Sequence, residues 1–176
     1  MAKTNTIPER LTAFRVYLDG TNDLKGVADI DLPSFENMKD TVKGAGIAGE
    51  YESPTLGHFG SSKLTLNWRT VEKKLLSIMK QQSQRFDCRG AFQDYDAGAG
   101  EYSIRQVRVV VQGPPTSIKP GKFEVGATTG GTTEIEALYI KISVDGVTVV
   151  EIDKLNFICV IDGVDHMADI RSALGL

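Results

Sequence analysis

The residues that could do chemistry are few, and their spacing does not favour catalysis. Nucleophilic catalysis needs a serine or cysteine beside a histidine base, yet neither His58 nor His166 lies in a recognisable motif. Zinc binding needs three or four cysteine and histidine ligands in local pairs, whereas Cys88 and Cys159 are scattered along the chain with the two histidines. We therefore expect no catalytic residue and no metal site, and we interpret both cysteines as buried, reduced thiols.

Four carboxylates could in principle pair for acid/base work. Glu134, Glu136, Glu151 and Asp153 lie in strand-like runs, where a carboxylate more often faces solvent or a partner protein. Their placement favours a structural protein over an enzyme.

Three glycine-containing stretches resemble ligand-binding loops without meeting their requirements. The GAGIAG run at 44–49 spells a dinucleotide fingerprint, which works only between a buried strand and a helix, and the residues on either side fit neither element. Gly121-Lys122 is followed by a phenylalanine instead of the serine or threonine of a phosphate loop. The loop that starts at Asp94 lacks the acidic and glycine positions of a calcium loop. We expect no cofactor, and we interpret 35–60 as a long strand with glycine bends.

Length and composition are those of one globular domain. A chain of 176 residues can bury about 70% of its unfolded surface in a single core. The net charge is −3 and the basic residues are dispersed, so the sequence shows no cluster of basic residues of the kind that specific DNA binding uses. The first ten residues lack the apolar centre of a signal peptide and no run reaches the ~20 apolar residues of a membrane span, which predicts a protein made and kept in a cytoplasm.

Most of the chain reads as β-strands. We expect a flexible arm over 1–10, then strands over 11–18, 26–32, 62–69, 84–95 and 102–112, each bounded by glycine, proline or aspartate. The alternation of Leu64, Leu66 and Trp68 with polar residues indicates a strand with one face in a core. The segment 116–133 is a loop or the tip of a long hairpin.

One helix is expected over 71–82. Its apolar residues recur at helical spacing, lysines occupy the other side, and Thr70 is available as the N-cap. A second, brief helix or ordered tail is expected beyond Ile161, with Asp165 as its cap.

The C-terminal stretch, 134–176, predicts a β-hairpin followed by a tail. Asp145-Gly146 stands between two strand-like runs, and both residue types tolerate the positive φ of a tight hairpin turn.

This stretch also carries a resemblance to a known family. Val144-Asp145-Gly146, 150–153, Asn156, Gly163-Val164-Asp165, Arg171 and the terminal Leu174-Gly175-Leu176 resemble the major tail tube protein of contractile-tailed bacteriophages and of related R-type bacteriocins. The opening of the chain agrees, with Asp19-Gly20 after a strand, then Leu32-Pro33 and the glycine cluster at 44–46.

The resemblance implies a mainly β fold, a sandwich or barrel of two packed antiparallel sheets with one flanking helix. Six copies would form a ring, and stacked rings would form a tube inside a contractile sheath. Two long hairpins, at about 36–69 and 102–145, would supply four strands per subunit to a shared inner barrel. The implied partners are further copies of the chain, the sheath, tape measure, baseplate and tail terminator proteins, and duplex DNA that passes without specific binding. The implied location is the virion tail, after assembly in the host bacterial cytoplasm, with no membrane anchor.

Two sets of residues follow as site hypotheses. For contacts between subunits we predict Glu151, Asp153, Asp165, Arg171, Leu174 and Leu176. A channel that conducts DNA should not grip its phosphates, so we expect a polar lumen of neutral to negative balance, with Glu36, Asp40, Glu50 and Glu52 as lumen-facing candidates.

Other functions remain open at this point. A tube protein of a headless, pyocin-like bacteriocin fits the same pattern. A type VI secretion-like tube protein shares the implied fold, but it would be expected without the C-terminal signature, the residues at 151–153 and 163–165. A small β-sandwich binding module would stay monomeric and present a ligand pocket.

Overall fold

The computed structural model describes residues 5–20 and 22–176, and it is mainly β, as the sequence predicts. The strands are β1 (Thr6–Leu18), β2 (Asn22–Asp23), β3 (Val27–Asp31), β4 (Asn37–Lys43), β5 (Glu50–Phe59), β6 (Lys63–Trp68), β7 (Gln84–Asp96), β8 (Glu101–Gly113), β9 (Pro115–Lys119), β10 (Gly131–Glu136), β11 (Tyr139–Val144), β12 (Val147–Asp153), β13 (Ile158–Ile161) and β14 (Val164–Asp165). The helices are α1 (Lys73–Ser77) and α2 (Ala168–Leu174).

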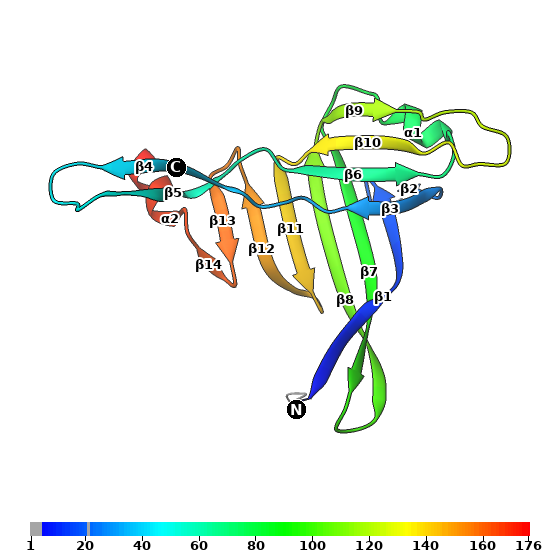
Figure 1. The fold of residues 1–176 in the computed structure, drawn as a ribbon, viewed down its shortest axis with the longest axis horizontal. Coiled ribbons are helices and arrows are strands. Elements are labelled where there is room, and N and C mark those ends of the chain that lie inside the picture. The colour runs from blue at the N-terminus through cyan, green and yellow to red at the C-terminus, as the bar shows by residue number, and fades with distance from the viewer. Residues whose placement is uncertain (1–4, 21) are drawn as a thin grey trace.

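Three antiparallel sheets organise the chain. An eight-stranded sheet has the order β14-β13-β12-β11-β8-β7-β1-β2, a four-stranded sheet has the order β3-β6-β10-β9, and β4 pairs with β5 alone. In Figure 1 the four-stranded sheet and α1 lie across one end of the large sheet. The β4–β5 hairpin extends to one side beside α2, and the far ends of β1, β7 and β8 project beyond the sandwich.

The core lies between the two larger sheets. Alternation on β7 and β8 sends Phe86, Cys88, Val109 and Val111 inward, where they meet Leu64, Leu66 and Trp68 of β6. The Trp68 indole donates a buried hydrogen bond of 3.1 Å to the Thr133 hydroxyl on β10, which satisfies the one polar atom of that ring. This packing confirms the predicted strand over 62–69 and its buried face.

The chain passes from the large sheet to the small one at Gly113. A side chain built at this position would overlap the Glu136 carbonyl oxygen. Only glycine therefore lets β8 end against β10 and continue into β9.

The predicted Asp145-Gly146 hairpin is present. β11 and β12 pair antiparallel up to Val144 and Val147, and Asp145 and Gly146 have φ values of 48° and 82°. Positive φ at both central residues is the type I′ pattern. The C-terminal stretch goes further than a hairpin, because β13 and β14 extend the same sheet before α2 begins.

Several predicted boundaries were wrong. Residues 6–10 of the expected arm form the start of β1, where Thr6 lies opposite Asp96 of β7; residues 1–4 of the arm lie outside the described residues. The run 44–49 is the turn between β4 and β5 instead of a bend within one strand.

The expected helix at 71–82 is reduced to a five-residue helix, α1. Only Leu75 of α1 is buried, together with Ile78 just beyond it, while Leu76 and Met79 are 44% and 57% exposed. Thr70 does not cap it; its hydroxyl hydrogen-bonds to the Glu72 carboxylate at 3.0 Å. Only part of the apolar stripe is thus buried, and packing of such a stripe is what stabilises short helices.

The two expected long hairpins are also different in the structure. Only residues 37–59 of the first form a hairpin, since β6 joins the four-stranded sheet. In the second, β8 and β11 are neighbours, but β9 and β10 leave for the other sheet between them. The longest hairpin is β7–β8, paired without interruption from Gln84 and Gly113 to Asp96 and Glu101.

Candidate assembly and lumen surfaces

The first two predicted interface residues, Glu151 and Asp153, are engaged within their own subunit. Glu151 on β12 accepts a 2.7 Å hydrogen bond from the Tyr139 hydroxyl and lies 3.1 Å from the Lys141 ammonium group. The Tyr139 hydrogen bond and the Lys141 charge outweigh burial and lower the Glu151 pKa, while burial and the bond to Glu151 raise the Tyr139 pKa to about 12. Asp153 accepts hydrogen bonds of 3.0 Å from the backbone N–H groups of Leu155 and Asn156, so it orders the turn that leads to β13.

Asp165 and Arg171 form a second internal contact. The Arg171 guanidinium lies 2.5 Å from the Asp165 carboxylate and donates a 2.7 Å hydrogen bond to the Phe157 carbonyl. The hydrogen bond from Arg171 lowers the pKa of Asp165. Asp165 also accepts a 3.0 Å hydrogen bond from the Met167 N–H, which begins the chain reversal before α2. The pair ties α2 to β13 and β14.

The two predicted C-terminal leucines are the outward part of the tail. Leu174 and Leu176 are 58% and 74% exposed, at the end of an α2 helix that closes on Gly175 in the left-handed conformation. Their exposure leaves them accessible to another subunit, and the contact itself stays a prediction.

A small second core places the β4–β5 hairpin. Ile152, Cys159 and Met167 are buried together, with Phe59, Phe157 and Ile170 packed against them. At the base of the hairpin, a methyl group added to Gly57 would overlap the Met167 sulfur. The Lys154 ammonium also donates a 2.8 Å hydrogen bond to the Gly60 carbonyl. The C-terminal segment therefore sets the direction in which the hairpin leaves the molecule.

The four lumen candidates lie on or beside this hairpin. Glu36 precedes β4, Asp40 is on β4, and Glu50 and Glu52 are on β5, all of them exposed. Glu52 forms an ion pair with Lys39 across the hairpin. A lumen exists only in an assembled ring, so the orientation of these four carboxylates toward it stays a prediction.

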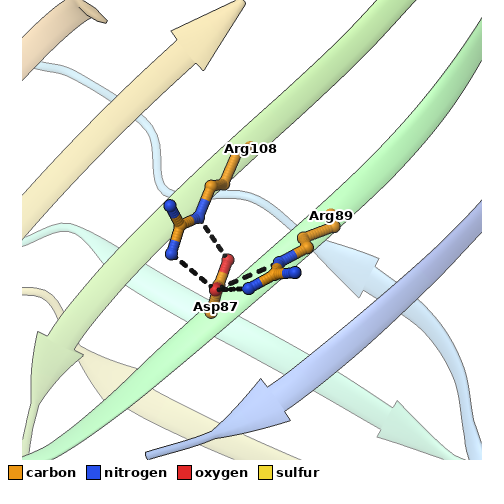
Figure 2. Close-up of polar contacts among 3 residues, drawn as sticks. All are labelled: Asp87, Arg89 and Arg108. Atoms are coloured by element: carbon orange, nitrogen blue, oxygen red, sulfur yellow. Dashed lines mark hydrogen bonds and ion pairs between the residues drawn. The ribbon is translucent and has the colours of Figure 1, made fainter. Parts of the chain in front are cut away.

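Sequence reasoning missed the outer face of the eight-stranded sheet. Here one carboxylate, that of Asp87 on β7, receives hydrogen bonds from Arg89 on the same strand and Arg108 on β8 (Figure 2). The Arg89 guanidinium also lies 4.8 Å from the centre of the Tyr17 ring on β1. The alternation in 102–112 places Arg108 on the side opposite the valines at 107, 109 and 111. Its pairing with Asp87 depends on the β7–β8 register, which no local pattern encodes.

Neither cysteine is suited to react. Cys88 and Cys159 are free and buried, as predicted, and burial raises the pKa of Cys88 to about 12. A thiol protonated at neutral pH is a poor nucleophile and a poor metal ligand. Within residues 5–20 and 22–176, no cluster of three or more potential metal ligands occurs and no helix is long and apolar enough to cross a membrane.

Known proteins resemble this chain along nearly its whole length. The model of the phage tail tube protein FII family matches residues 8–175. The major tail tube protein of Serratia phage KSP20 is 32% identical over 171 residues, which cover 97% of this chain and 98% of that protein. The tail tube protein of Escherichia phage P2 is 26% identical over 177 residues, covering 97% and 99%.

A solved structure shares the fold. It is the sheath/tube terminator of an extracellular contractile injection system, PVC, in its extended state, with a TM-score of 0.53 and 16% sequence identity over 77% of this chain and 96% of that one. The family match across the chain, together with the 32% identity to a phage relative, establishes that the chain belongs to the phage tail tube protein FII family.

Proposed function

We propose that this protein is the structural subunit of the inner tube of a contractile phage tail. Six copies form a ring, stacked rings form the tube, and the sheath surrounds it. Duplex DNA passes through the channel into the host. The full-length similarity to two phage tail tube proteins carries this proposal, and a structural role requires none of the catalytic groups that the sequence lacks.

The other partners follow from the same role. The tube ends meet the baseplate and the tail terminator, and a tape measure protein occupies the channel during assembly. Subunits are made and assembled in the host bacterial cytoplasm and then reside in the virion tail.

The eight-stranded sheet is the part suited to form the wall of the tube. β1, β7 and β8 each have 13 residues, or about 43 Å of strand at ~3.3 Å per residue. With β11 beside them, four strands per subunit would give roughly 24 in a ring, hence a barrel about 37 Å across at ~4.8 Å per strand. These strands replace the two hairpins expected from the sequence.

The polar face of this sheet supports a channel that does not hold DNA. One face packs on the four-stranded sheet, so the other is the one available to line a lumen. Four of its cations are paired: Arg15 with Asp23 at 3.1 Å, Lys141 with Glu151 at 3.1 Å, and Arg89 and Arg108 with Asp87. Cations already paired with carboxylates attract phosphates less. We add this face to the hairpin carboxylates as a lumen candidate; a strongly positive channel in the assembled tube would argue against both.

The hairpin and the C-terminal tail are the candidate contacts between subunits. An isolated two-stranded sheet is marginally stable in water, and this one exposes Met38, Tyr51 and Leu56 at 54%, 54% and 68%. Covering these side chains with a neighbouring copy would stabilise both the hairpin and the assembly.

Electron microscopy of the purified full chain tests the proposal. Long hollow tubes are expected, and a chain that stays monomeric at high concentration would contradict every ring-forming function. A variant truncated after Ile161 loses β14, α2 and the second-core residues Met167 and Ile170, and it should form no tubes. Normal tubes from this variant would contradict a role of the tail in assembly.

The second candidate function is the tube of a headless bacteriocin or of a type VI-like injection machine. The C-terminal residues 151–153 and 163–165, which carried the resemblance, favour the phage-type tube over the type VI tube. Gene neighbours that encode a sheath without a capsid would favour the bacteriocin.

A further inference from the structure

Asp87 combines an outward position with almost complete burial. It lies on the polar face of the eight-stranded sheet, opposite Tyr17 of β1 and Val110 of β8, yet its side chain is only 3% exposed. The groups that cover it include the two guanidiniums that bind it, from Arg89 and Arg108, whose side chains are themselves half exposed.

The carboxylate occupies two N–H donors of each arginine. Arg108 contacts it through Nε at 2.9 Å and Nη2 at 2.8 Å, and Arg89 through Nε at 3.1 Å and Nη2 at 2.7 Å (Figure 2). The Arg108 contact, with one hydrogen bond to each carboxylate oxygen, matches the forked geometry by which arginine binds phosphate, whereas Arg89 directs both donors to Oδ2. The same donors that would recognise a phosphate are thus held on an internal anion.

Without this anion the face would carry a row of cations. The strand register places Arg15, Arg89 and Arg108 directly beside one another on β1, β7 and β8. Across the neighbouring strands, Lys141 adds a fourth cation, and Asp23, Asp87 and Glu151 are the carboxylates that contact these four. Among these seven side chains, removing the charge of Asp87 would raise the excess of positive charge from one to two per subunit.

We propose that Asp87 is a masking residue: it holds Arg89 and Arg108 so that the polar face does not bind the phosphates of duplex DNA that moves over it. The inference rests on the proposed function, in which this face lines a channel for DNA. In such a wall, Arg89 would still pack against the Tyr17 ring. The N–H donors of Arg89 and Arg108 that could bind phosphate would stay occupied by Asp87.

The test compares the unmodified full chain with Asp87→Asn for binding of a fluorescent duplex of ~20 base pairs over a series of salt concentrations. The unmodified chain is expected to bind weakly. Asp87→Asn is expected to bind at least ~10-fold more tightly at low salt, with a dependence on salt that steepens by about 0.9 per phosphate newly neutralised.

Asp94→Asn is the matched control. Asp94 is seven residues further along the same strand, so it lies on the opposite face; it is also buried, and it pairs with a single arginine, Arg105, at 2.9 Å. It changes the net charge equally and should leave DNA binding near the unmodified level. The triple variant Asp87→Asn/Arg89→Gln/Arg108→Gln should return binding to that level.

The outcomes distinguish failure of the masking role from failure of the proposed function. Equal DNA binding by Asp87→Asn and Asp94→Asn, or stronger self-association of Asp87→Asn without stronger DNA binding, would overturn the masking role. If Asp87→Asn does not fold, Asp23→Asn, which frees Arg15 on the same face, must tighten DNA binding or the masking idea fails. Absence of tubes in electron microscopy of the unmodified chain would instead overturn the proposed function.

Discussion

Replacing Gly57 by alanine should show whether the C-terminal segment directs the β4–β5 hairpin. Gly57 has φ of 67°, and an added Cβ would overlap the Met167 sulfur and lie 2.6 Å from its Cγ. Two costs arise. The left-handed backbone costs a non-glycine residue about 1–2 kcal/mol, and displacing Met167, which is 3% exposed, forfeits part of the ~1.5–3 kcal/mol gained by burying such a side chain.

Gly130→Ala separates these two costs. Gly130 has nearly the same φ, 64°, but no atom lies within 4 Å of the position that an added Cβ would take, so only the backbone cost of about 1–2 kcal/mol applies. Gly57→Ala should therefore lower the free energy of unfolding by roughly 2–4 kcal/mol, measured by urea denaturation of the unassembled chain. It should also reduce tube formation more than Gly130→Ala does.

A double variant tests the contact itself. In Gly57→Ala/Met167→Ala the shorter side chain leaves room for the new methyl group, so the two losses should be less than additive, as expected for residues in contact. Equal destabilisation by Gly57→Ala and Gly130→Ala, or strict additivity with Met167→Ala, would refute the idea that this contact positions the hairpin.

Three further variants test single features of the fold. Thr133→Val leaves the buried Trp68 indole N–H without its acceptor and should lower the free energy of unfolding by about 1–3 kcal/mol in urea denaturation. Asp153→Ala removes the acceptor of two backbone N–H groups in the turn before β13 and should cost about 1–2 kcal/mol in the same measurement. Burial acts to raise the Asp87 pKa, but hydrogen bonds from Arg108 and Arg89 lower it overall from 3.8. The ionised carboxylate therefore stabilises the folded chain fully above pH 3.8, and this stabilisation is lost as the pH falls through the lower pKa of the folded state. The free energy of unfolding of Asp87→Asn should thus decline less steeply with acid than that of the unmodified chain.

Local alternation and turn chemistry predicted most individual strands. The runs at 62–69, 84–95 and 102–112 each place apolar residues on one face, and all three are strands with that face in the core. The Asp145-Gly146 turn was equally predictable, because positive φ at both positions suits these residue types.

Strand partners could not be predicted in the same way. β6 and β10 alternate like β7 and β8, yet they form a different sheet, because an inward-facing pattern does not say which sheet a strand joins. β1 pairs with β7 although the paired residues lie 68 to 90 positions apart in the chain, and the pairing has two register shifts near Pro8 and Leu11. The contact between Asp87 and Arg108 depends on such pairing, so no sequence motif could have indicated it.

The internal bonds of the C-terminal signature change the role that its residues can have in assembly. Glu151, Asp153, Asp165 and Arg171 all hold partners within the subunit, and the segment they order contains Met167, which packs against the hairpin base. Their contribution to a tube would therefore be indirect: they fix the hairpin and expose the C-terminal leucines. Substituting Asp165 should then impair assembly only as far as it loosens the second core. Substituting Leu174 or Leu176, which are largely exposed, should impair assembly while leaving the stability of the single chain unchanged.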